Sequence, residues 1–102
     1  MNDEILKKVY DIAIQRKSAS PDSSYVAKLY ALGEDKILEK VGEEAIETIL
    51  AHKSGDRAQI VYETADLLFH AIVALALKDI HVKEVLNELE SRFGKTGLRD
   101  QG

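Results

Sequence analysis

Apolar side chains recur every three or four residues along most of the chain, and no segment shows the strict alternation of apolar and polar residues that marks a half-buried strand. This spacing is typical of helices with one buried face, so the pattern predicts an all-α fold. A first helix is expected over residues 3–17. Its apolar face is formed by Ile5, Leu6, Val9, Ile12 and Ala13.

Ser, Asp and Gly residues mark where the next helices begin and end. The Ser- and Asp-rich segment 18–24 predicts a loop, because these side chains compete for backbone hydrogen bonds. A short helix at 24–32 is expected to stop at Gly33, which suits a left-handed C-terminal cap. Asp35 is then expected to cap a third helix at 36–52.

The third predicted helix joins a fourth, at 57–78, through a turn at 53–56. Gly55 is placed to end the first of these helices and Asp56 to start the second. We expect the two helices to lie antiparallel, as a hairpin that forms the core of the fold and is buried almost all round along the fourth helix. A fifth helix is predicted at 82–92, which gives about five helices in all.

The composition suits one folded domain spanning residues 1–102. Hydrophobic residues make up 45% of the chain and charged residues 31%, a balance typical of globular proteins. The formal net charge of −4 argues against binding to nucleic acid or to an acidic membrane surface. The polar, Gly-rich end at 94–102 is expected to be mobile until something binds it.

The sequence also gives an expectation about where in the cell the protein is found. It contains no Cys, and its N-terminus lacks the apolar block of a signal peptide, so we expect a cytoplasmic protein. The longest apolar stretch, 67–77, covers only about half of the ~20 residues that a membrane crossing requires. It therefore predicts a core helix, with no membrane partner.

Acidic residues gather on the two helices of the predicted hairpin. On the fourth helix, Glu63, Asp66 and His70 fall within an arc of about 60° in an otherwise apolar segment. On the third helix, an arc of about 100° at 100° per residue carries two cations and three carboxylates. These are Lys36, Lys40, Glu43, Glu44 and Glu47.

The spacing about Gly55 predicts that the two acidic groups meet. Glu44 and Glu47 precede Gly55 by eleven and eight residues, and Asp66 and Glu63 follow it by the same numbers. In an antiparallel hairpin Glu44 would therefore be level with Asp66, and Glu47 with Glu63. Four partly buried carboxylates cannot all stay ionised unaided, and a divalent cation would resolve this. Carboxylate oxygens favour Mg²⁺ or Mn²⁺ over zinc.

A second interpretation of the same residues stays open. Glu residues three apart on a helix are usually a solvated face, often paired with Lys. The acidic arc would then belong to a metal-free helical dimerisation module. Lys36 and Lys40 are likewise open to two interpretations, as phosphate-binding groups or as partners in ordinary salt bridges to Glu39 or Glu44. His70 is expected to be a hydrogen-bonded core histidine.

The acidic pattern resembles a known family. An ExxE pair at 44–47 followed by an ExxD pair at 63–66 is similar to the all-α nucleoside triphosphate pyrophosphohydrolases. Three longer segments, in order, resemble the phosphoribosyl-ATP pyrophosphohydrolases of histidine biosynthesis across residues 23–98. They are SYVAKLYALGEDKILEKVGEEAIE, YETADLLFHAIVAL and LNELESRFGKTGL.

This resemblance implies a Mg²⁺-dependent hydrolase that converts a small nucleotide, phosphoribosyl-ATP, to phosphoribosyl-AMP and pyrophosphate. It also implies a homodimer with a helical bundle at its centre. By position the metal ligands would be Glu44, Glu47, Glu63 and Asp66, and Glu43 would orient or deprotonate the attacking water. Beside Lys36 and Lys40, the substrate would be contacted by Arg92, Gly94, Thr96 and Gly97.

Two further expectations concern the choice within this superfamily. The alternative to the phosphoribosyl-ATP enzyme is a house-cleaning pyrophosphohydrolase with the same metal site and a different base pocket. In related enzymes the activity is often fused to the cyclohydrolase that acts next. A chain of 102 residues has no room for that second domain, so we expect a stand-alone enzyme.

Overall fold

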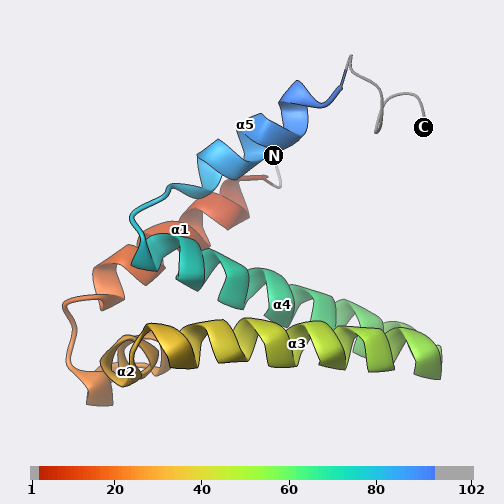
Figure 1. Cartoon of the computed structure of the whole chain (residues 1–102), viewed down its shortest axis with the longest axis horizontal. Helices are drawn as coiled ribbons and strands as arrows, with labels where there is room; N and C mark the ends of the chain where they lie inside the picture. Colours follow the sequence, from red (N-terminus) through yellow and green to blue (C-terminus); the bar gives the residue numbers. More distant parts are fainter. Residues whose placement is uncertain (1–2, 94–102) are drawn as a thin grey trace.

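The computed structural model describes residues 3–93, and within that range it contains helices and no strand (Figure 1). The predicted all-α class with five helices is confirmed. The helices are α1 (Asp3–Arg16), α2 (Tyr25–Leu32), α3 (Glu34–Ser54), α4 (Arg57–Leu77) and α5 (Val82–Ser91), with a short 3₁₀ helix, η1, at Pro21–Ser23. Three predicted substrate contacts, Gly94, Thr96 and Gly97, lie outside the described residues, as does the end expected to be mobile, 94–102.

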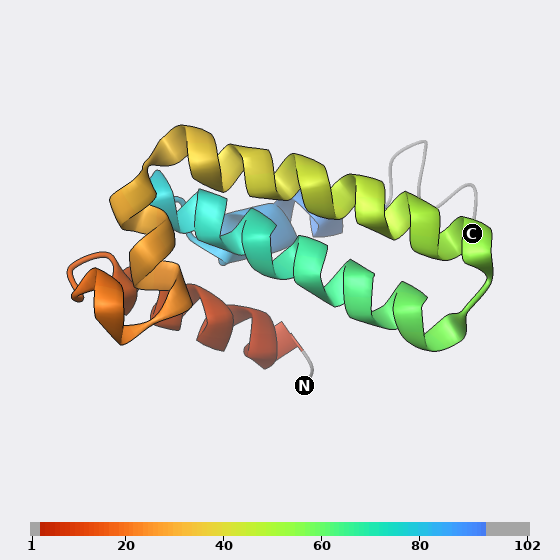
Figure 2. The same cartoon turned by 90° about the horizontal axis from the view of Figure 1, so that it is seen from below.

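The centre of the fold is the predicted antiparallel hairpin of α3 and α4, each 21 residues long (Figures 1 and 2). Gly55 ends α3 in a left-handed conformation with φ 76°, and its N–H donates to the carbonyls of Ala51 and His52. The Asp56 carboxylate then accepts hydrogen bonds from the N–H groups of Ala58 and Gln59 at the start of α4. Both predicted caps are therefore confirmed.

The start of α3 differs from the prediction. Gly33, with φ 104°, ends α2 and is also the first cap of α3, because its own carbonyl accepts from the N–H of Ile37 at 3.3 Å. The helix therefore begins at Glu34, and the expected cap at Asp35 is wrong. Asp35 lies instead in the first turn, where a carboxylate interacts favourably with the helix dipole.

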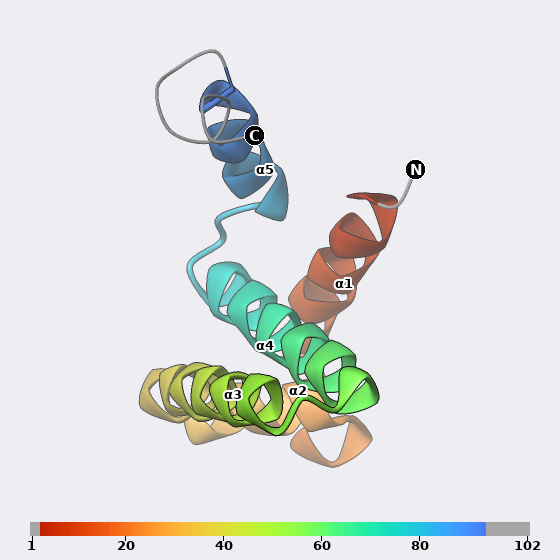
Figure 3. The same ribbon diagram turned by 90° about the vertical axis from the view of Figure 1, so that its right-hand side faces the viewer.

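The remaining helices cover the hairpin unequally. Figure 3 shows α1 and α5 on the side of α4 that faces away from α3, while α2 packs against α3. Ser24 caps α2 by accepting from the N–H of Ala27 at 3.0 Å. The core side chains come from all five helices: Tyr10, Ala13, Val26, Leu29, Ile37, Ile72, Val73, Ala76 and Val82.

The expectation that α4 is buried almost all round is wrong for the single chain. Val61, Tyr62 and Leu68 on α4 are 62%, 65% and 51% exposed, because α1 and α3 cover only part of its circumference. By length and composition alone α4 would also be able to cross a membrane, a test that core helices of soluble proteins pass as well. The hairpin thus carries an apolar face that no other part of residues 3–93 covers.

Candidate metal centre

The hairpin brings Glu44 of α3 and Asp66 of α4 together with His70. Among residues 3–93, these are the three side chains grouped closely enough to hold one ion, with ligand atoms within 4.8 Å of one another. Glu44 is 7% exposed and His70 3%, while Asp66 is half-buried. The predicted pairing of Glu44 with Asp66 at equal depth is therefore what the structure shows.

Thr48 fixes the register of the two helices at this depth. Its hydroxyl lies 2.7 Å from the carbonyl oxygen of Glu44 on its own helix and 3.1 Å from that of Glu63 on α4. One hydroxyl hydrogen is thus shared between two acceptors on facing helices. Thr48 therefore contacts α4 at Glu63, within one residue of the level predicted for Glu47.

Burial makes the Glu44 carboxyl unusual. Loss of solvent raises the pKa of Glu44 to about 7, and the hydrogen bond and negative charge of Asp66 act in the same direction. Lys40 opposes this rise in pKa and Glu63 adds to it. A raised pKa means that the Glu44 carboxyl can keep its proton at a higher pH than an ordinary glutamate, which lets the two facing acids lie together without a cation.

Of the two predicted phosphate-binding cations, Lys40 lies against the acids of the site. Its ammonium lies 3.7 Å from Oε2 of Glu44 and 3.3 Å from Oε1 of Glu43. Lys36 makes an ordinary surface pair with Glu39 at 2.8 Å. Lys40 therefore partly screens the acidic residues of the site.

The other predicted metal ligands border the cluster without joining it. Glu47 is exposed and lines an open groove of about 350 Å³ together with Lys40, Glu43, Glu44 and Ile46. Glu63 is half-buried on α4, and its charge is one of the causes of the raised pKa of Glu44. Their assignment as ligands, and that of Glu43 as the group that activates water, stay predictions.

His70 is a buried, fully hydrogen-bonded residue, as expected. Its Nε2 lies 2.8 Å from the hydroxyl of Tyr25, the first residue of α2. Its Nδ1 lies 2.9 Å from the carbonyl oxygen of Asp66 and 3.4 Å from Oδ1 of the same residue. No sequence pattern indicated the contact with Tyr25, because the two residues are 45 positions apart and on different helices.

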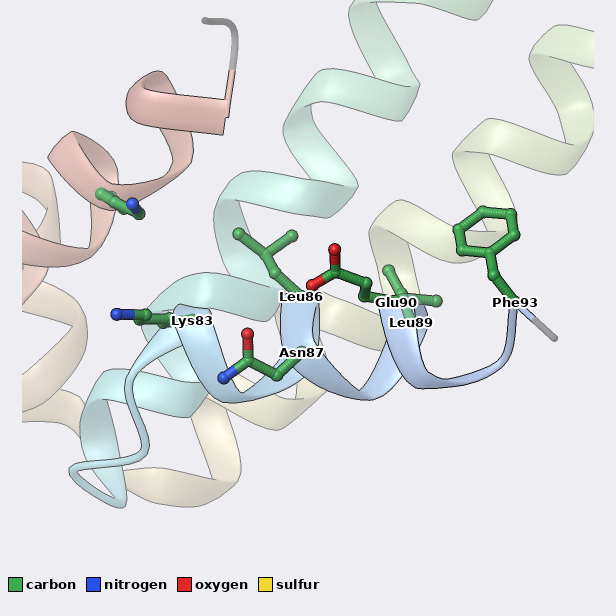
Figure 4. Close-up of a pocket in the computed structure, with 7 residues that line it drawn as sticks. Lys83, Leu86, Asn87, Leu89, Glu90 and Phe93 are labelled. Atoms are coloured by element: carbon green, nitrogen blue, oxygen red, sulfur yellow. The ribbon is translucent and has the colours of Figure 1, made fainter. Parts of the chain in front are cut away.

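A second groove of about 350 Å³ lies elsewhere, between α1 and α5 (Figure 4). It shares no lining residue with the acidic groove and is bordered by Lys7, Lys83, Leu86, Asn87, Leu89, Glu90 and Phe93. Arg92, a predicted substrate contact, is exposed just beyond the end of α5 and pairs with Glu88 at 3.2 Å. Among residues 3–93, Glu44, Asp66 and His70 remain the one group of side chains placed to hold a metal ion.

Comparison with known proteins gives the family. The family model described as phosphoribosyl-ATP pyrophosphohydrolase matches residues 6–93. This chain belongs to that family. The match includes the whole of the hairpin and both acidic pairs.

Individual relatives agree with the family match. A phosphoribosyl-ATP pyrophosphatase of Geobacter sulfurreducens is 57% identical over 93% of this chain and 88% of its own length. A protein of the same name from Geotalea daltonii is 48% identical over 99% of this chain and 95% of its own. A third protein of that name, from Vesicomyosocius okutanii, is 50% identical over 97% of this chain and 94% of its own length.

Proposed function

We propose that this protein hydrolyses phosphoribosyl-ATP to phosphoribosyl-AMP and pyrophosphate in histidine biosynthesis. The observation that carries the proposal is the pair of buried Glu44 and half-buried Asp66, which the hairpin brings together in a chain of this family. A soluble nucleotide substrate and the absence of Cys both support a cytoplasmic location.

The donor set of the site fits a hard divalent cation. Carboxylate oxygens are the protein ligands that Mg²⁺ and Mn²⁺ prefer. Two facing carboxylates repel each other when both are ionised, and a bound cation removes that repulsion. We assign Glu44, Glu47, Glu63 and Asp66 to hold it. When bound, the ion would offset negative charge on the triphosphate oxygens and on the departing pyrophosphate.

The remaining groups of the groove have separate roles in this proposal. Glu43, exposed beside Glu44, accepts the proton of the water that adds across the bond between the α- and β-phosphates. Lys40 moves from its carboxylate partners to a phosphate oxygen. Further substrate contacts are assigned to Lys36, Arg92, Gly94, Thr96 and Gly97.

We also propose that the protein is a homodimer. Ile46, Ile49 and Leu50 of α3 are 59%, 60% and 58% exposed, and α4 exposes an apolar face as well. Exposed apolar patches of this kind are usually covered by a partner. A second copy of the hairpin would cover these residues and complete a helical bundle. Tyr62 and Phe69 would then lie in the core of the dimer.

Product analysis tests the activity directly. The protein is incubated with phosphoribosyl-ATP and Mg²⁺, in parallel with a panel that includes dUTP and the common nucleoside triphosphates. We expect phosphoribosyl-AMP and pyrophosphate, with loss of the activity when the ion is removed by a chelator. Good turnover of the ordinary triphosphates, with none of phosphoribosyl-ATP, would overturn the proposal in favour of a house-cleaning enzyme.

Two conservative variants test the site. Asp66→Asn and Glu44→Gln each remove one charge from the paired acids, and each is expected to lower the rate on the order of 10²-fold or more, with helical content unchanged by circular dichroism. Asp11→Asn is the matched control, because Asp11 is exposed on α1. Full activity in Asp66→Asn would contradict the assignment of Asp66 as a metal ligand.

A further inference from the structure

Another groove, which we call the α2 groove, lies at η1 and the first turn of α2. It has a volume of about 380 Å³ and is lined by polar and charged residues beside one proline and one tyrosine. The lining residues are Pro21, Asp22, Ser23, Ser24, Tyr25 and Lys28. None of them lines the acidic groove of α3, so the two grooves are separate features of the surface.

Tyr25 connects the α2 groove with the metal centre. Its hydroxyl lies 2.8 Å from Nε2 of His70, which belongs to the metal-binding group. Burial is the main cause that raises the pKa of Tyr25, while the charge of Lys40 lowers it and that of Asp66 raises it further. The α2 groove and the metal centre therefore lie on either side of one tyrosine, which is 48% exposed.

Lys28 is the cation of the α2 groove. It is exposed one turn after Tyr25, and no ion pair of its ammonium is found among residues 3–93. Lys36 and Lys40, by contrast, both lie against carboxylates of α3. Lys28 can therefore bind an anion without first leaving a carboxylate partner in the described part of the chain.

The proposed substrate has phosphate at both of its ends. Phosphoribosyl-ATP carries a triphosphate on one ribose and a single phosphate on the second ribose, which is attached to the base. Ordinary nucleoside triphosphates lack that second phosphate. A metal ion serves the triphosphate end, but a phosphate monoester carries a charge of about −1.5 to −2 at neutral pH and needs donors of its own. Preference for phosphoribosyl-ATP therefore requires a cation away from the metal centre.

We propose that Lys28 binds the phosphate of the phosphoribosyl group, and that the α2 groove is where the enzyme distinguishes phosphoribosyl-ATP from ordinary nucleoside triphosphates. This inference rests on the proposed function, because it assigns one end of that substrate. With its triphosphate at the metal centre, the substrate crosses the exposed side of Tyr25 to reach Lys28. The Ser24 hydroxyl accepts from the N–H of Ala27 at 3.0 Å and still has its own hydrogen to donate to the phosphate.

Steady-state kinetics of Lys28→Gln test the contact. We expect the KM for phosphoribosyl-ATP to rise about tenfold or more and kcat to stay within about twofold, because the lost contact lies away from the bond that is cleaved. Lys28→Arg keeps the positive charge and should have a KM much closer to that of the wild type. Lys8→Gln is the matched control, since Lys8 is exposed on α1 and lines neither groove. An unchanged KM in Lys28→Gln would overturn the proposal.

Inhibition by the two products shows which end of the substrate Lys28 contacts. Pyrophosphate competes for the metal centre alone, whereas phosphoribosyl-AMP carries the phosphate assigned to the α2 groove. At constant free Mg²⁺, Lys28→Gln should raise the inhibition constant of phosphoribosyl-AMP about tenfold and leave that of pyrophosphate within about twofold. An equal rise for both products would place Lys28 at the triphosphate end and end the proposal.

Asp22 gives a test of the opposite sign. Its carboxylate is exposed in the same groove and repels a bound phosphate. Asp22→Asn should therefore lower the KM for phosphoribosyl-ATP by about two- to fivefold. A higher KM in this variant would contradict the binding of an anion in the α2 groove.

These outcomes separate the role of Lys28 from the proposed function. A wild type that does not hydrolyse phosphoribosyl-ATP would end both. A wild type that hydrolyses it, with the same KM in Lys28→Gln, would end only the assignment of the α2 groove. Because Lys28 and Asp22 are both exposed, the variants should keep the helical content of the wild type by circular dichroism.

Discussion

At the scale of single residues, the Glu44 carboxyl combines burial with a nearby negative charge. Its pKa is raised from 4.5 to about 7, chiefly by burial and then by Asp66. A raised carboxyl pKa in the folded state contributes stability below the unfolded value of 4.5, and this contribution is lost as the pH rises toward about 7. Without a cation, the fold is therefore expected to be less stable above about pH 7, where the Glu44 carboxyl is ionised.

The pH dependence of metal binding follows from this residue. Because an ion binds the ionised carboxylate, Mg²⁺ must displace the proton of Glu44, and we expect roughly one proton released per site at about pH 6 and close to none at about pH 9. Calorimetric titrations in two buffers of different ionisation enthalpy measure that number. A proton count that does not change between these pH values would contradict the assignment of Glu44 as a ligand.

At the scale of the elements, the register of α3 against α4 decides whether the site exists. Equal spacing about Gly55 was enough to predict that Glu44 meets Asp66, because two straight helices of the same rise keep equally spaced residues level. The same reasoning missed the first turn of α3, where Gly33 caps both neighbouring helices. It also missed the Tyr25 contact, since the position of α2 depends on packing that periodicity does not report.

Thr48 provides a test of the register. Thr48→Val keeps the shape of the side chain and removes the hydroxyl shared by the carbonyls of Glu44 and Glu63. We expect a loss of about 0.5–1.5 kcal/mol in the free energy of unfolding, measured with urea, together with weaker Mg²⁺ binding. Thr64→Val on α4 is the control, because no hydrogen bond of the Thr64 side chain is found among the described residues. Equal effects of the two changes would contradict the role of Thr48 in fixing the register of α3 against α4.

The two glycines of α3 and its turn should respond in opposite ways to the same substitution. Gly55→Ala places a side chain at φ 76° and is expected to lower the free energy of unfolding by about 1–2 kcal/mol. Gly42→Ala, inside α3 where an added Cβ would have no atom within 4 Å, is expected to raise it by about 0.5–1 kcal/mol. Thermal unfolding of both variants measures the difference, and a stabilising Gly55→Ala would contradict the left-handed turn.

At the scale of the whole molecule, the described residues of a single chain leave many large apolar side chains exposed. The hairpin is long, and α1, α2 and α5 cover only part of it (Figures 2 and 3). The sequence predicted apolar residues around most of α4 but not which of them the chain itself would cover. That distinction depends on the crossing of α1 over α4, which no local pattern encodes.

The exposed face gives a prediction about assembly. Light scattering should give twice the chain mass of 11.4 kDa for the wild type. Tyr62→Asp places a charge among the exposed apolar residues and should give a monomer at the same concentration, because burying an unpaired carboxylate is costly. Gln15→Glu, which adds a charge to an exposed position of α1, should leave the mass unchanged. A wild type with the mass of a single chain would contradict the proposed homodimer.

Gly55 lies eleven residues from both Glu44 and Asp66, and this symmetry limits how the gene can change in length. Losing one codon between Glu44 and the turn would rotate that carboxylate by about 100° and shift it by ~1.5 Å along its helix. The loop at 18–23, before the cap of α2 at Ser24, sets no register between α3 and α4. Insertions and deletions in descendants of this gene should therefore collect in that loop, while the arm lengths of the hairpin pass unchanged from one lineage to the next.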